Sequence, residues 1–318
     1  MESVPCPACA NPASSVLFEG RDVLHGGPGV FPVRRCTGCG LIYVSPRPAP
    51  DEIAAYYPAG YGPHAVPGDP ATPDRGRRRN ILQAVRWIES AAPVRGRALD
   101  VGCGAGGILE ELRSRGWSVC GVEPAPAAAA MARDRLGLDV RPGPLQTAGF
   151  DRDDFDLVCF WHSLEHVPDP RDTLIEAARV TKPGGTLVLS LPNPENWMAR
   201  WFGPDWCGWD VPRHLCLFPR RTLARLLEKT GWEAPRIRAR GGRFWYISMS
   251  LENRARSRGR LSAAHRQMLR ALTSRAAQAL TLPLFILFER LDRSPNLLVT
   301  ARRAPSSPPI TPTTPESP

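Results

Sequence analysis

The sequence predicts an α/β fold: a doubly wound sheet, a small metal-binding module before it, and a helical insertion before its last strand. From residue 97 onward, short apolar runs alternate with segments of helical spacing, as in parallel βαβ units. Two C-x-x-C pairs lie within the first 39 residues, where they predict the metal-binding module. A glycine-rich turn after the first of the apolar runs predicts a ligand site.

The composition is that of a globular protein and indicates no particular partner. The chain has 318 residues, 42% of them hydrophobic and 23% charged, which is ordinary for a globular protein. The net charge of +10 comes almost wholly from arginine, since Lys182 and Lys229 are its only lysines. With 35 prolines, this bias is typical of a GC-rich genome, so the charge does not indicate a nucleic-acid partner. We expect a cytoplasmic protein, because we see neither a signal peptide nor a membrane span.

The first predicted module, residues 1–48, is a zinc ribbon. Cys6 and Cys9 form one C-x-x-C pair and Cys36 and Cys39 form another, with twenty-six residues between the pairs. Four thiolates from two such turns make a closed tetrahedral site, so the zinc is expected to be structural and not catalytic. The alternative of two disulfides suits a secreted chain better.

A connector with N-terminal helices is expected over residues 49–94. Its proline-rich start leads into a short helix from Asp51 to Tyr57, for which Asp51 is the expected N-cap. Apolar residues at helical spacing then predict an amphipathic helix over 77–91.

The main domain is expected over residues 95–303. Alternating strands and helices in this order place ligands at the carboxyl ends of the strands. We predict strands at 97–101, 118–122, 139–141, 155–160, 185–190 and 296–301, and helices at 108–113, 125–136, 172–180 and 221–230. The helical insertion is expected at about 243–293, and the proline-rich tail, 304–318, is expected to be disordered.

The glycine-rich turn after the first strand carries the chemistry. Gly102, Gly104 and Gly107 formally satisfy the dinucleotide pattern G-x-G-x-x-G. However, Asp100 lies two residues before the first glycine, where its carboxylate would repel a pyrophosphate. It suits the ammonium and the sulfonium of S-adenosylmethionine instead.

Several further motifs fit that ligand, and with them the chain resembles the class I S-adenosylmethionine-dependent methyltransferases. The motifs lie over roughly residues 95–240 and include Leu99–Gly106, Gly121–Pro124, Ser163–Val167, Lys182–Gly185 and Asp210–Leu215. The cysteine pairs look like the zinc ribbon that is fused to a bacterial subgroup of these enzymes. The resemblance implies a Rossmann-like methyltransferase sheet.

The resemblance also implies roles for individual residues. Asp100 would lie near the ammonium of the cofactor, and Glu123 would accept from both ribose hydroxyls. Pro144 and Leu145 follow the third strand, where the adenine is expected, although the aspartate that family members often have there is missing. The full set of expected cofactor contacts is Asp100, Gly102, Cys103, Gly104, Gly106, Glu123, Pro124, Pro144, Leu145, Trp161 and His162.

Two histidines are candidate general bases. Methyl transfer depends largely on orientation, and a base is needed only when the acceptor is protonated. His166 and His214 could each take the proton of a hydroxyl acceptor. The alternative is that they hold their loops in place.

The expected acceptor is a small molecule, with a hydroxyl oxygen preferred. Four tryptophans between residues 197 and 209 form either a lid over an apolar acceptor or a packed excursion of the chain. The apolar stretch 279–288 is too short to cross a bilayer, and it suits core, homodimer or peripheral membrane contact.

Other functions stay open at this point. The acceptor could be an RNA or a membrane lipid, although we regard nucleic acid as the less favoured partner. A NAD-dependent oxidoreductase would use the same glycine-rich turn. A non-catalytic binding module organised by the ribbon is a further alternative, against which Asp100 and Glu123 together argue.

Overall fold

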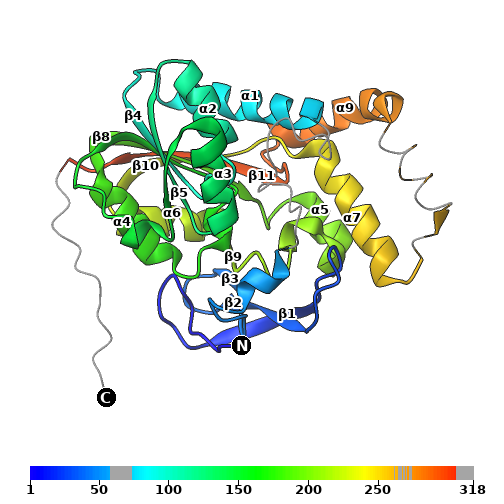
Figure 1. Cartoon of the computed structure of the whole chain (residues 1–318). Coiled ribbons are helices and arrows are strands. Elements are labelled where there is room, and N and C mark those ends of the chain that lie inside the picture. The colour runs from blue at the N-terminus through cyan, green and yellow to red at the C-terminus, as the bar shows by residue number, and fades with distance from the viewer. Residues whose placement is uncertain are drawn as a thin grey trace.

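The computed structural model describes residues 1–57, 74–260 and 274–305, together with residues 262, 263, 267, 269 and 271. The chain forms two sheets, one of seven strands and one of four (Figure 1). The tail predicted to be disordered lies outside the described residues from residue 306 onward.

The seven-stranded sheet is the core of the molecule, and it confirms the predicted strands. Five neighbouring strands are parallel, whereas β11 runs antiparallel to both β8 and β10. The sheet is therefore mixed and not purely parallel as expected. In spatial order it consists of β10 (Trp232–Ala239), β11 (Asn296–Arg303), β8 (Thr181–Pro192), β7 (Phe155–Trp161), β4 (Arg97–Val101), β5 (Ser118–Glu123) and β6 (Asp139–Pro142).

One edge strand, β10, was not predicted. Its sequence contains Pro235, which cannot donate to a ladder and is tolerated only at an edge or a bulge. The pairing of β10 with β11 is irregular between Glu233 and Arg236, and Ala234 has a positive φ of 48°. This bulge interrupts the alternation by which a strand is recognised in the sequence.

Helices cover both faces of this sheet (Figure 1). Ala98 of β4 packs in a cluster with α1 and α2, whereas Leu99 packs in a cluster with α4 and α6, as the two-residue period of a strand requires. The helices are α1 (Asp74–Ala91), α2 (Gly107–Ser114), α3 (Pro126–Leu136), α4 (Pro170–Val180) and α6 (Arg220–Lys229).

The strand order defines the place of a ligand. β4 lies between β7 and β5, so the chain winds outward in opposite directions from β4. The carboxyl ends of β4, β5 and β7 therefore surround a topological switch point, where open α/β sheets bind their ligands.

The second sheet belongs mainly to the N-terminal module and is antiparallel. Its strands are β1 (Ser14–Gly20), β2 (Phe31–Cys36), β3 (Ile42–Val44) and β9 (Cys216–Leu217), in that order. Its fourth strand thus comes from a segment that follows β8. Further hydrogen bonds join the module to the main domain, including those from Thr222 Oγ1 to the carbonyl of Cys39 (2.7 Å) and from Arg47 Nη1 to that of Pro168 (2.8 Å).

A second core lies beside the N-terminal sheet. Trp206 and Trp209, both buried, pack there with Phe31 and Tyr246, so these two tryptophans belong to a packed excursion. Trp201 is 58% exposed. The surrounding elements are η1 (Ile53–Tyr56), α5 (Trp197–Phe202), η5 (Gly203–Asp205), η6 (Cys207–Trp209), α7 (Arg243–Ser257) and α9 (Arg275–Arg290).

The apolar stretch 279–288 lies on α9 and is only partly core. Phe285 is buried and packs on Phe244, whereas Leu280, Leu284 and Leu287 are 83%, 48% and 49% exposed. Contact of this face with a second copy or a membrane surface stays a prediction. Within the part of the chain that the structure describes, no helix is long and apolar enough to cross a membrane.

Candidate functional site

The glycine-rich turn lies at the switch point, between β4 and α2. The backbone N–H groups of Gly102 and Cys103 donate to the carbonyl of Val122 (2.8 and 3.1 Å), which joins the turn to β5. Gly102 has a φ of 79°, and a Cβ at this position would lie 2.5 Å from Cβ of Ser163. A side chain is therefore excluded at Gly102 by both conformation and space.

Glu123 ends β5 and holds this turn in place. One of its carboxylate oxygens accepts from Gly104 N (2.7 Å) and the other from Ala125 N (2.8 Å). The side chain is 5% exposed. Both carboxylate oxygens of Glu123 are therefore held at the carboxyl end of β5, beside the glycine-rich turn.

Asp100 lies below the turn and is 2% exposed. Its Oδ1 accepts from the Cys159 thiol (3.2 Å). Burial raises the pKa of Asp100 to about 7. Among the described residues, the side chains that also shift this pKa are Cys159 and Glu123, and neither is basic. Such a carboxylate favours a cation bound beside it, because a buried unpaired charge is costly.

The remaining expected cofactor contacts differ in accessibility. Leu145 is 1% exposed and packs in the main core, so only its backbone is available to a ligand. Cys103 packs in another buried cluster. Pro124, Pro144 and His162 are exposed, and Trp161 is half-buried with its ring 6.2 Å from that of Trp87.

His162 and Glu165 form a pair just after β7. Glu165 lies in the short helical turn η4 (Leu164–His166) and is fully buried. Its Oε1 lies 3.3 Å from His162 Nδ1, whereas its Oε2 has no hydrogen-bond partner among the described residues. Burial raises the pKa of Glu165, but the hydrogen bond with His162 and the charges of the three neighbouring histidines together outweigh this, so the net shift of the pKa is downward.

His166 and His214 are brought together, with ring centroids 4.7 Å apart. Nδ1 of His166 lies 3.0 Å from the carbonyl of Arg213, and Nδ1 of His214 lies 2.8 Å from that of Gly208. Because a carbonyl only accepts, we assign the proton to Nδ1 in both rings, which leaves each Nε2 as an acceptor. Burial lowers the pKa of His166 to about 4.

Tyr57 and Arg213 complete this region and were not predicted from the sequence. The Tyr57 hydroxyl lies 3.0 Å from Nδ1 of His166, and burial raises its pKa. Arg213 is fully buried and donates to Asp22 of the N-terminal module (2.8 and 2.9 Å) and to Asp210 (2.6 and 3.1 Å). Its partner Asp22 is 191 positions away, a separation at which no sequence pattern signals a contact.

The four cysteines of the N-terminal module lie together. The four sulfur atoms lie within 4.8 Å of one another, and none of them is in a disulfide: Cys6, Cys9, Cys36 and Cys39. The sulfur atoms of Cys6 and Cys39 are 3.5 Å apart and those of Cys9 and Cys36 are 3.6 Å apart. Four convergent cysteine sulfurs fit the donor set of a structural zinc ion.

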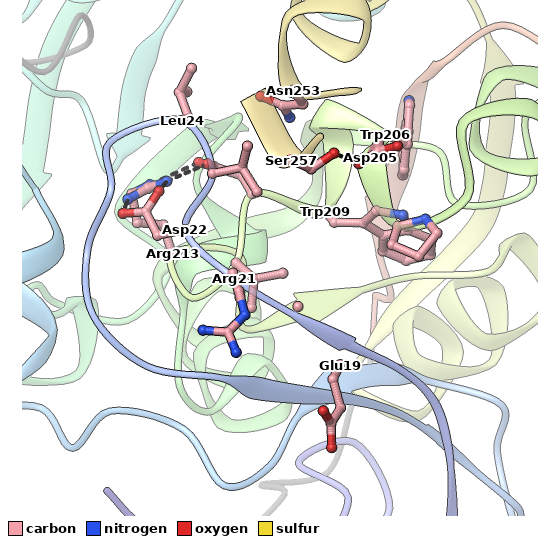
Figure 2. A pocket seen from close by; sticks show the side chains of 15 residues that line it. Glu19, Arg21, Asp22, Leu24, Asp205, Trp206, Trp209, Arg213, Asn253 and Ser257 are labelled. Atoms are coloured by element: carbon pink, nitrogen blue, oxygen red, sulfur yellow. Dashed lines mark hydrogen bonds and ion pairs between the residues drawn. The ribbon is translucent and has the colours of Figure 1, made fainter. Parts of the chain in front are cut away.

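A cavity of about 140 Å³ lies elsewhere, between the β1–β2 loop, the 204–213 segment and α7 (Figure 2). The Asp22–Arg213 ion pair lies at one side of it and Trp206 and Trp209 at the other (Figure 2). Trp206 Nε1 and Asn253 Oδ1 are buried, and neither has a hydrogen-bond partner in the part of the chain that the structure describes. None of the expected cofactor contacts lines this cavity.

Comparison with known proteins gives a family match and several relatives. A family model described as a methyltransferase domain matches residues 74–235, about half of the chain. A ubiquinone biosynthesis O-methyltransferase from Pseudomonas paraeruginosa is 33% identical over 138 residues, which cover 41% of this chain and 60% of the relative. One of the same description from Alkalilimnicola ehrlichii is 36% identical over 118 residues, covering 35% and 48%. The chain thus spans less than two thirds of the length of these curated relatives.

Among solved structures, one described as a SAM dependent methyltransferase from Archaeoglobus fulgidus is similar. It is 16% identical, with a TM-score of 0.47, and the match covers 71% of this chain and 93% of that chain.

Proposed function

The chain belongs to the methyltransferase-domain family, and on that premise we propose that it transfers a methyl group from S-adenosylmethionine to a hydroxyl oxygen of a small molecule. The observation that carries the donor assignment is Asp100, a buried carboxylate at the switch point whose described surroundings supply no basic partner. The ammonium of S-adenosylmethionine would supply that positive charge, and Glu123 would accept from the ribose.

Calorimetry with the full chain tests the donor. We expect S-adenosylmethionine to bind with one site per chain and NAD to give no heat of binding. Binding of NAD without S-adenosylmethionine would favour the oxidoreductase alternative. Binding of neither would favour a non-catalytic module.

The acceptor is proposed from two observations. The curated relatives that match are named as O-methyltransferases, which favours oxygen as the acceptor atom. The paired rings of His166 and His214 lie beside the buried Glu165, so this cluster is a suitable place for the proton of a hydroxyl to leave. A membrane lipid or an RNA would change the substrate but not this chemistry.

Within the pair, His214 is the better candidate to receive the proton. His166 is held through Nδ1 by both Tyr57 and Arg213, which suits a residue that fixes its loop. His214→Ala is expected to lower turnover about 10²- to 10⁴-fold, the usual contribution of a general base. Affinity for S-adenosylmethionine is expected to be unchanged, and an equal loss in both quantities would contradict the role.

For the N-terminal module we propose a structural zinc ion. The convergence of Cys6, Cys9, Cys36 and Cys39 supports it. Metal analysis of the reduced protein is expected to find one zinc per chain that is lost in Cys6→Ser. Absence of zinc from the reduced wild-type protein would remove the proposal.

A further inference from the structure

Glu165 has an unpartnered oxygen in a place where charge is costly. Its side chain is fully buried, and its Oε2 forms no hydrogen bond with any residue that the structure describes. Leaving a buried carboxylate oxygen without a partner costs more than leaving a neutral oxygen without one, so Oε2 calls for a ligand that the described residues do not supply.

The two neighbouring histidines are oriented in the way that metal ligands are. Each donates its Nδ1 proton to a backbone carbonyl, His166 to Arg213 and His214 to Gly208. Such a bond fixes the tautomer and the direction of the ring, and it presents the lone pair of Nε2 to the opposite side. Both rings are therefore prepared to donate electron pairs at Nε2.

These three side chains converge. A carboxylate oxygen of Glu165 and one ring nitrogen each of His166 and His214 lie within 4.8 Å of one another. Two imidazoles and one carboxylate form the donor set that holds divalent first-row transition metals with coordination positions left open.

The surrounding charges also favour a cation. Asp22, Asp210 and Glu165 are three carboxylates in and beside this region, and Arg213 is the guanidinium that pairs with the first two. Glu165 interacts with His162 instead and is not joined to Arg213 by any ion pair among the described residues. A divalent ion at the cluster would balance the remaining negative charge.

We propose that Glu165, His166 and His214 form a second metal site, which binds a divalent transition-metal ion and is distinct from the four-cysteine cluster. The role of this site rests on the proposed methyl transfer to a hydroxyl oxygen, and it replaces the general-base role of His214, because the lone pair of His214 Nε2 would be donated to the ion. An open coordination position on the ion would hold the acceptor oxygen and lower the pKa of its hydroxyl. The O–H bond breaks with the proton passing to solvent, the oxygen bonds to the methyl carbon, and the C–S bond breaks to release S-adenosylhomocysteine.

Titration with Mn²⁺ followed by electron paramagnetic resonance tests the site in the full-length protein. Mn²⁺ is chosen because the cysteine cluster prefers softer ions, whereas nitrogen and oxygen donors accept it. We expect one Mn²⁺ bound per chain in the wild type and affinity reduced by more than about tenfold in Glu165→Gln and His214→Gln. The matched control is His25→Gln, since His25 is exposed in the β1–β2 loop outside the cluster.

A spectroscopic measurement on the wild type does not depend on whether the variants fold. Electron spin echo modulation is expected to show nitrogen couplings from two imidazoles on bound Mn²⁺. Absence of these couplings, or equal Mn²⁺ affinity in folded Glu165→Gln and in His25→Gln, would overturn the proposal.

Measurements of methyl transfer and of S-adenosylmethionine binding show whether the metal site or the proposed function is wrong. If methyl transfer persists undiminished after chelation has removed the nitrogen-bound ion, the metal role is wrong and the base role of His214 stands. If Mn²⁺ binds with two imidazole couplings but S-adenosylmethionine does not bind, the site is supported and the proposed function fails.

Discussion

The donor half and the acceptor half of the candidate site are built in different ways. The donor half consists of the glycine-rich turn with Asp100 and Glu123, which lie 23 positions apart along the chain and on adjacent strands. The acceptor half consists of Tyr57, Glu165, His166, Arg213 and His214, and its anchor, Asp22, belongs to the N-terminal module. One half is local in sequence, whereas the other depends on contacts between distant segments.

The two halves are stabilised by different kinds of contact. Backbone hydrogen bonds within a βα unit shape the donor half, so it forms wherever the sheet forms. The acceptor half depends on a buried guanidinium between two carboxylates, an arrangement that is strongly destabilised when one partner is removed. We therefore expect substitutions to separate the two halves.

The largest effect is expected from Arg213→Met. It leaves Asp22 and Asp210 buried without their cation, which is expected to lower the free energy of unfolding by about 3–5 kcal/mol. Urea unfolding measures this loss, and Arg221→Met, at an exposed position on α6, serves as the control. If the folded variant lost affinity for S-adenosylmethionine as strongly as turnover, the separation of the two halves would be wrong.

A smaller effect is expected from Glu123→Gln in the donor half. The amide keeps the size of the side chain but loses the charge, so affinity for S-adenosylmethionine should fall by about 1.5–3 kcal/mol, roughly 10- to 150-fold. Calorimetry measures it against Glu228→Gln, an exposed position on α6. Unchanged affinity in Glu123→Gln would remove the ribose assignment.

The smallest effect is a pH dependence set by Asp100. Its pKa is raised to about 7 by burial, and the ionised form is the one that attracts the ammonium. Affinity for S-adenosylmethionine should therefore rise with pH up to about 7 and level off above it, with a loss of roughly tenfold for each unit below. In Asp100→Asn the binding should be weak and independent of pH over this range. A wild-type affinity that is constant from acidic to neutral pH would contradict the assignment.

The sequence was a good guide to the donor half for a physical reason. The strand, the turn and the following helix are specified by neighbouring residues, and the positive φ of Gly102 is a requirement that glycine meets. The predicted strand ending at Val101 and the turn after it are confirmed. The roles assigned to Asp100 and Glu123 toward the cofactor stay predictions.

The acceptor half could be predicted only as isolated residues. His166 and His214 were singled out by their chemistry, but their proximity follows from the path of the chain after β8. Tyr57 gave no signal and Arg213 was noted only as a member of the Asp210–Leu215 motif, because the importance of both arises from partners that the fold supplies. The side chain of Leu145 is packed in the core, so the contact expected of this residue stays a prediction for its backbone alone.

The N-terminal sheet has a consequence for the order in which the protein is made. Its strand β3 pairs with β9, and Asp22 pairs with Arg213, so both partners are synthesised far later than the module itself. At translation rates of 5–20 residues per second, the 191 positions between Asp22 and Arg213 correspond to a wait of roughly 10 to 40 seconds. During that interval the nascent module has an open strand edge and a carboxylate without its cation. Only a chain extended past residue 217 contains both missing partners, so the acceptor half cannot assemble on a shorter product.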